Sequence, residues 1–114
     1  MIRPRRVFAQ HWLKSEKALT EILRAAELKE GERILEIGPG TGILTRRLLP
    51  LVESLVAVEI DRNLCEHLVK EFRKAENFLL LQGDFLELDL PSLLEGNSAF
   101  QNPKKVVANI PYNI

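Results

Sequence analysis

Polar residues with hydrogen-bonding side chains stand where four apolar runs of this 114-residue chain end. Glu36 lies in RILEIG, Glu59 in LVAVEI, Asp84 in LLLQGD, and Asn109 in VVANIP. A carboxylate can accept hydrogen bonds from both hydroxyls of a diol, and it can also accept one from an exocyclic amine. These residue types therefore suit a ligand built like a nucleoside: Glu59 would hold the ribose and Asp84 the amine of an adenine.

The segment Asn109–Asn113, NIPYN, could act on a second adenine. The N6 amine of adenine is a poor nucleophile because its lone pair is delocalised into the ring. The side-chain oxygen of Asn109 and a nearby backbone carbonyl could accept its N–H groups, while Pro111 stiffens the turn and Tyr112 stacks on the base. We take Asn109 and Tyr112 as the candidate catalytic residues; the alternative is an ordinary proline turn.

Three glycines at alternate positions, Gly38, Gly40 and Gly42, follow the first of these runs. Glycine lets the backbone take positive φ values and approach a ligand without an intervening Cβ. A dinucleotide-binding loop would read GxGxxG, whereas this one reads acid-x-G-x-G-x-G and resembles the first motif of S-adenosylmethionine-dependent methyltransferases. The alternative is a tight strand-to-helix turn with no ligand.

The elements that would position these residues alternate between strands and helices. Strands are predicted at Arg33 to Ile37, Leu55 to Ile60, Phe78 to Leu81 and Lys105 to Asn109. Helices are predicted after Ser15 as far as Leu28, over Thr41 to Leu49, from Asp61 with Leu64, Cys65, Leu68, Val69 and Phe72 facing inward, and near Pro91. This alternation predicts an α/β, Rossmann-like parallel sheet in the order 3-2-1-4, with ligands at the carboxyl ends of its strands.

Composition excludes several classes of protein. The single Cys65 rules out an internal disulfide and a cysteine-cluster metal site, and we expect no metal. No apolar run approaches membrane-spanning length and no signal peptide is visible, so we expect a cytoplasmic protein without a membrane partner.

Charge is unevenly distributed although the formal net charge is zero. Residues 1–17 carry five basic residues and one acidic residue, whereas residues 53–95 carry ten acidic and four basic residues. A basic arm of this kind can contact phosphates; a solvated terminus explains the charge equally well.

Five motifs in order, AQHWL, EIGPGTGILT, VAVEID, QGDF and NIPYNI, are similar to those of the ribosomal RNA small-subunit adenine N6-dimethyltransferase family. The resemblance implies the methyltransferase fold and transfer of methyl groups from S-adenosyl-L-methionine to N6 of two adjacent adenosines near the 3′ end of small-subunit rRNA. It also implies a role in ribosome biogenesis, a pre-30S ribosomal particle as partner, and a monomeric full-length enzyme.

The same resemblance implies roles for individual residues. The positions matching the family's cofactor contacts are His11, Leu13, Gly38, Glu59, Asp84 and Asn109. Asn109 and Tyr112 match its target-base motif.

Two departures from the family pattern stand out. The family's N-terminal motif usually reads GQNFL, so His11 replaces an amide here. The sequence also ends at Ile114, before the remaining strands of a seven-stranded methyltransferase sheet and before the family's C-terminal helical domain. We therefore expect residues 1–114 to be the N-terminal part of the catalytic domain, with a basic arm at 1–17 that carries a cofactor motif and a Rossmann-like core at 18–114.

Three alternatives remain open at this stage. One is the related large-subunit rRNA adenine N6-methyltransferase of the macrolide-resistance type, which shares the motifs. Another is a non-catalytic rRNA-binding assembly factor, which an intact Glu59 and an intact NIPY disfavour. The third is a cofactor-binding fragment without turnover.

Overall fold

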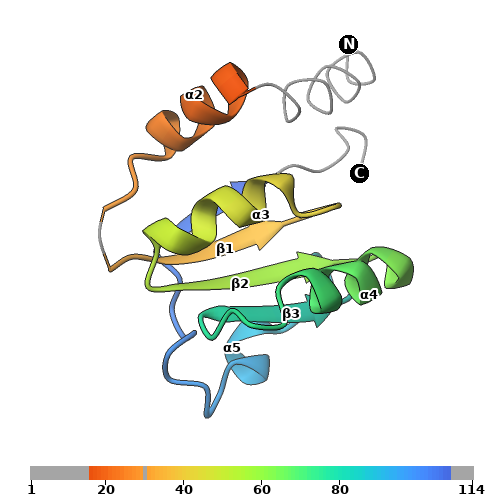
Figure 1. Ribbon diagram of the computed structural model, residues 1–114. Helices are drawn as coiled ribbons and strands as arrows, with labels where there is room; N and C mark the ends of the chain where they lie inside the picture. Colours follow the sequence, from red (N-terminus) through yellow and green to blue (C-terminus); the bar gives the residue numbers. More distant parts are fainter. Residues whose placement is uncertain (1–15, 30, 109–114) are drawn as a thin grey trace.

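A parallel sheet of four strands forms the centre of the computed structural model, which describes residues 16–29 and 31–108 (Figure 1). The strands are β1 (Arg33–Ile37), β2 (Ser54–Glu59), β3 (Phe78–Gln82) and β4 (Lys105–Ala108), in the order β3-β2-β1-β4. The predicted topology is thus confirmed, and its strands agree with the predicted ranges to within one residue at each described end.

β1 and β2 are the buried centre of the sheet. Every residue of β2 is buried, and in β1 only Arg33 is partly exposed. Strands covered on both faces bury apolar side chains at successive positions, which explains runs such as LVAV in place of an apolar and polar alternation. Because Ile37 pairs with Val58 in β2 and with Ala108 in β4, all three strands reach the same edge at their carboxyl ends.

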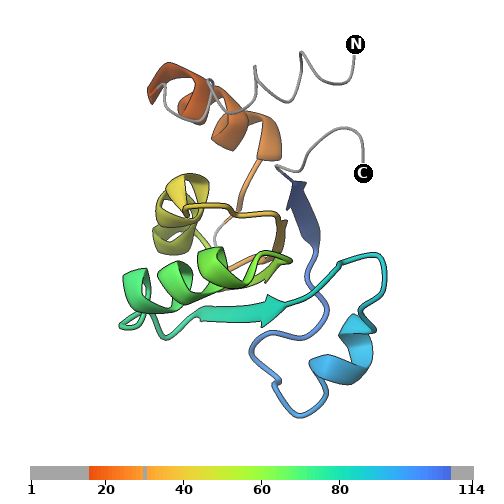
Figure 2. The ribbon, with the colours of Figure 1, turned by 90° about the vertical axis from the view of Figure 1, so that its right-hand side faces the viewer.

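Among the described residues, helices α2 (Glu16–Ala26), α3 (Ile43–Leu48) and α4 (Arg62–Glu71) lie on one face of the sheet, and the shorter α5 (Leu90–Leu93) lies on the other (Figure 2). The 3-10 turn Leu49–Leu51 follows α3 in the same layer.

Alternate residues of the strands supply two cores. On the α3 face, Ile34 and Leu55 pack with Leu44 and Leu48. On the α5 face, the cluster comprises Leu35, Ile37, Val56, Val58 and Leu94. Removal of one such buried leucine side chain typically costs about 2–5 kcal/mol of stability, so each helix layer contributes substantially to holding the site's framework.

Local chemistry sets the ends of the helices. The Asp61 side chain accepts a hydrogen bond from the Leu64 amide at 3.0 Å and caps α4, as the predicted start at this residue requires. The end of α2 is held from β4, where Lys105 donates to the backbone oxygens of Ala26, at 2.9 Å, and Glu27. The chain turns at Glu27 with φ of 48°, so α2 ends two residues before the predicted Leu28.

Two helix predictions need correction. The helix predicted over Thr41 to Leu49 begins at Ile43, because Gly42 still has a left-handed φ of 91°, and it ends at Leu48, where the 3-10 turn Leu49–Leu51 follows. Val69 was predicted to face inward but is 56% exposed. The buried stripe of α4 runs through Cys65 and Leu68 to Phe72, and Val69 lies beyond it.

Candidate cofactor site

The glycine segment Gly38–Gly42 joins β1 to α3 at the carboxyl edge of the sheet. Gly38, Gly40 and Gly42 have φ values of 71°, 63° and 91°, in the left-handed region that residues other than glycine rarely adopt. The Gly38 amide donates to the Val58 carbonyl at 2.9 Å, which anchors the start of the segment on β2. Sequence reasoning predicted this turn, and the structure confirms its backbone conformation.

Two glycines of this segment have different surroundings. A Cβ at Gly42 would lie 2.7 Å from Cε2 of Phe72 and 3.1 Å from Cδ2 of Leu68, so this position is closed by α4. A Cβ at Gly40 would meet no atom within 4 Å among the described residues. Gly42 is therefore needed for packing, while the open side of Gly40 leaves backbone accessible to a ligand.

Glu59, at the end of β2, joins the glycine segment to the turn that precedes α4. Its side-chain oxygens accept hydrogen bonds from the Gly40 amide, at 3.1 Å to Oε1, and from the Asp61 amide, at 3.0 Å to Oε2. Glu59 is 6% exposed. A carboxylate has about four acceptor positions, so two remain for the hydroxyls of a ligand.

Glu36, in β1, is a fully buried carboxyl group just before the glycine segment. Thr45 of α3 donates from Oγ1 to its Oε1 at 2.6 Å, while Oε2 has no hydrogen-bond partner within the described part of the chain. Burial raises the pKa of Glu36 to about 7, an effect that the Thr45 hydrogen bond opposes and the nearby Glu59 charge reinforces. Glu36 is thus partly neutral near pH 7.

Asp84 follows β3 and lies next to the end of β2 in the sheet, because the Gly83 amide donates to the Glu59 backbone carbonyl at 2.9 Å. One oxygen of Asp84 accepts from the Leu86 amide at 2.9 Å, which leaves the other for a ligand. Two apolar residues near these acids could flank an adenine: Ile60, beside Glu59, is 65% exposed, whereas Phe85 is partly buried and packs against the core on the α5 face.

The remaining predicted site residues, His11, Leu13, Asn109 and Tyr112, lie outside the described residues. The structure thus brings Gly38, Glu59 and Asp84 together at one edge of the sheet. The described part of β4 ends at Ala108, opposite Ile37 of β1, and so reaches the same edge.

Sequence reasoning missed three residues that support this site. Thr45 holds Glu36, the Cys65 thiol donates to the Glu59 carbonyl at 3.4 Å, and His67 Nε2 lies 3.1 Å from the Thr41 carbonyl. Burial and the charges of Glu59 and Asp61 raise the pKa of Cys65, which keeps this thiol protonated. The sequence signal that could have predicted the contact of Thr45 with Glu36 is a hydroxyl residue beside the apolar residues of α3, nine positions after the acid in β1.

The described residues of the site carry negative charge. None of the ion pairs found between described residues includes Glu36, Glu59 or Asp84. Over residues 16–29 and 31–108, no group of three or more histidine, cysteine or acidic side chains is arranged to hold a metal ion. An acidic edge without these ion pairs suits a ligand that brings positive charge and hydroxyl groups.

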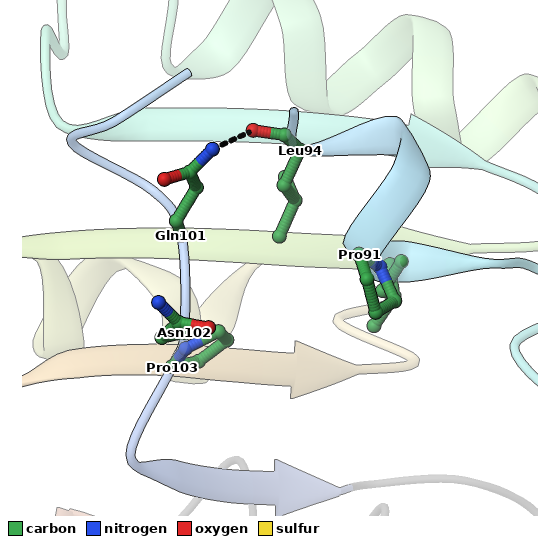
Figure 3. Close-up of a pocket in the computed structure, with 6 residues that line it drawn as sticks. Pro91, Leu94, Gln101, Asn102 and Pro103 are labelled. Carbon is green, nitrogen blue, oxygen red and sulfur yellow. Dashed lines mark hydrogen bonds between the residues drawn. The ribbon is translucent and has the colours of Figure 1, made fainter. Parts of the chain in front are cut away.

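A separate hollow of about 310 Å³ lies between α5 and the segment that leads into β4, away from the glycine segment (Figure 3). It is lined by Leu90, Pro91, Leu94, Gln101, Asn102 and Pro103. Gln101 donates from its amide to the Leu94 carbonyl at 3.0 Å across this hollow. This hollow shares no lining residue with the site at the carboxyl edge, and its lining offers apolar groups and amides in place of carboxylates.

Solved structures with this architecture define the class of fold. A dimethyladenosine transferase from Plasmodium falciparum is 30% identical, with a TM-score of 0.71 over 88% of this chain and 34% of that chain. The 23S rRNA methyltransferase ErmE is 32% identical, with a TM-score of 0.60 over 65% of this chain and 30% of that chain. The fold is therefore the Rossmann-like fold of S-adenosylmethionine-dependent methyltransferases.

The family follows from sequence similarity over the whole chain. The profile of the family described as ribosomal RNA adenine dimethylase matches residues 1–114. Ribosomal RNA small subunit methyltransferase A of Trichormus variabilis is 73% identical over 114 residues, which are 100% of this chain and 42% of that protein. The chain belongs to the ribosomal RNA adenine dimethylase family, and it spans about two fifths of the length of such relatives.

Proposed function

We propose that this chain forms the cofactor-binding part of an enzyme that dimethylates N6 of two adjacent adenosines of small-subunit rRNA, using S-adenosylmethionine. The observation that carries the proposal is Glu59, whose buried carboxylate contacts the Gly40 amide and retains acceptor capacity beside the glycine segment. The 73% identity to a relative named for the small subunit favours that target over the large-subunit alternative.

The described residues fit this cofactor. The open backbone at Gly40 suits close approach of a ligand, Glu59 can accept from both ribose hydroxyls, and Asp84 can accept from the adenine amine. When bound, S-adenosylmethionine supplies a methyl group on a positively charged sulfonium. The carboxylates of Glu59 and Asp84 at this edge would favour this positively charged ligand.

The remaining roles rest on the family's motifs. His11, Leu13 and Asn109 are proposed to complete the cofactor site, and Asn109 and Tyr112 to hold the target adenine. We assign residues 1–17 to a basic arm and 18–114 to the Rossmann-like core of the catalytic domain. A pre-30S particle is the proposed partner, with the cytoplasm as the place of action and a monomer as the full-length form. No helix in the described ranges is long and apolar enough to cross a membrane.

The proposal is tested by cofactor binding to a full-length chain that carries this sequence. Each charge-assisted hydrogen bond contributes roughly 1.5–3 kcal/mol, so Glu59→Ala should raise the dissociation constant of S-adenosylmethionine at least about tenfold in calorimetry. Glu66→Ala is the matched control, because Glu66 is an exposed acid on α4 whose carboxylate lies 3.9 Å from Arg62. Equal affinities of a folded Glu59→Ala variant and the control would remove Glu59 from the cofactor site.

A further inference from the structure

The buried pair of Glu36 and Thr45 has no role in the site as proposed so far. Glu36 is a wholly buried carboxyl group with a single hydrogen bond, from the Thr45 hydroxyl, and its Oε2 lacks a partner among the described residues. An ionised carboxylate with an unpaired oxygen is costly in such surroundings. A buried group of this kind keeps its proton more readily than an exposed one does.

The charged groups around Glu36 do not compensate for its ionisation. Glu59 of β2 adds negative charge. On α3, Arg46 and Arg47 pair instead with Glu71 and Glu16. On α4, the titratable group directed toward the sheet is Cys65, which bonds to the Glu59 backbone carbonyl and keeps its proton.

β4 supplies no compensating positive charge beside Glu36 either. Its Val107 is the residue in register with Glu36, and its Lys105 is paired with Glu32 and with the end of α2. Of the ion pairs between described residues, none neutralises Glu36. A positively charged ligand at the glycine segment would therefore change the balance that keeps the Glu36 proton in place.

We propose that Glu36 releases its proton to solvent when the site takes up S-adenosylmethionine, so that the Glu36–Thr45 pair makes cofactor affinity depend on pH and on the charge of the sulfonium. This inference rests on the proposed function. Glu36 lies in β1, two residues before Gly38, and the glycine segment that follows β1 contacts Glu59 through the Gly40 amide. A positively charged ligand at the glycine segment would therefore lie near the buried Glu36 carboxyl group. Glu36 is a positioning residue that acts through the glycine segment.

The linkage between proton release and cofactor binding gives the size of the pH effect on affinity. The pKa of about 7 in the ligand-free protein would fall on binding, and a nearby opposite charge typically lowers a carboxyl pKa by about one unit or more. A fall of one to two units makes the affinity for S-adenosylmethionine about five- to tenfold weaker at pH 6 than at pH 8. About half a proton or more should be released per ligand at pH 6.5.

The experiment uses calorimetry on a full-length chain that carries this sequence. S-adenosylmethionine is compared with S-adenosylhomocysteine, which has the same amino acid and nucleoside but a neutral thioether. The α-amino group of each ligand also titrates in or near this pH range, and the sulfonium lowers its pKa in S-adenosylmethionine alone. The affinity ratio in the wild type is therefore divided by the same ratio in Glu36→Gln, which removes that titration. This normalised ligand ratio should rise about five- to tenfold from pH 6 to pH 8.

Variants of Thr45 separate this role from a merely structural one. Thr45→Val removes the hydrogen bond that favours the carboxylate, so the midpoint of the pH dependence should move to higher pH. Thr45→Ser keeps the hydroxyl and should restore the wild-type midpoint. A structural defect alone would weaken both ligands at every pH without moving the midpoint.

Proton release by the wild-type protein tests whether Glu36 loses its proton on cofactor binding, even if a variant does not fold. Titration at pH 6.5 in two buffers of different ionisation enthalpy counts the protons released on binding. Release of about half a proton supports the proposal; binding with no proton exchange and a constant normalised ligand ratio overturns it while the proposed function stands. Failure of both ligands to bind at any pH would overturn the two proposals together.

Discussion

Replacement of Glu36 by glutamine should change how the free energy of unfolding depends on pH. The pKa of Glu36 is raised from 4.5 to about 7, mainly by burial. A group whose pKa is higher in the folded state than in the unfolded state stabilises the protein below its unfolded pKa, and this contribution disappears as the pH rises through the folded pKa. The wild type should therefore lose about 2–3 kcal/mol from this residue between pH 5 and pH 8.

The glutamine side chain has nearly the same shape, keeps the oxygen that accepts from Thr45, and does not titrate. Urea unfolding of the wild type and Glu36→Gln at pH 5, 6, 7 and 8 measures the difference directly. The free energy of unfolding of the variant should gain about 2–3 kcal/mol relative to the wild type across this range, whereas that of Glu66→Gln, at an exposed position of α4, should run parallel to the wild type. A constant difference between Glu36→Gln and wild type would refute the argument that burial keeps Glu36 protonated.

The remaining predictions concern the glycine segment and the target-base motif. Gly42→Ala should cost about 2–4 kcal/mol in urea unfolding, because a Cβ at φ of 91° would lie 2.7 Å from Phe72. Gly40→Ala, with open space around it, should cost only about 1 kcal/mol; equal losses would contradict this reasoning. Asn109→Ala should slow single-turnover methylation of small-subunit particles by about 10²–10³ at saturating cofactor; a rate within a few-fold of wild type would reduce NIPY to a turn. Tyr112→Phe should retain most activity and Tyr112→Ala should lose most of it; equal activities of the two variants would show that the ring does not stack on the base.

The framework of the site was predictable because its signals are local and strong. Short apolar runs bounded by glycine or acidic residues predicted β1 and β2, and the alternation with helices predicted parallel pairing. Carboxyl ends of parallel strands share an edge, which is why Glu59 and Asp84 could be expected together before any contact was known. The contact from the Gly40 amide to Glu59 then follows from the geometry of that edge.

Other features depend on packing, which a linear pattern does not contain. Val69 and Leu68 are adjacent and both apolar, yet only Leu68 lies on the face of α4 that meets the sheet. The late start of α3 follows from the left-handed conformation of Gly42, where the Phe72 ring also leaves no room for a Cβ. Both outcomes depend on how α4 packs against the sheet and the glycine segment. Residue types alone do not specify that packing.

Glu59 shows why sequence reasoning predicted a ligand contact but not the role of this residue within the fold. As a ligand group it needs only a carboxylate at the end of a strand. In the structure its two oxygens also accept from the amides of Gly40 and Asp61, so the glycine segment and the start of α4 are held by the same group. A glutamine at this position would turn an amide NH₂ toward one of those two donors and leave it unpaired. Under the proposed function, recognition of the ribose and organisation of the loop depend on one charge, so glutamine, a neutral residue of similar size, should not replace Glu59.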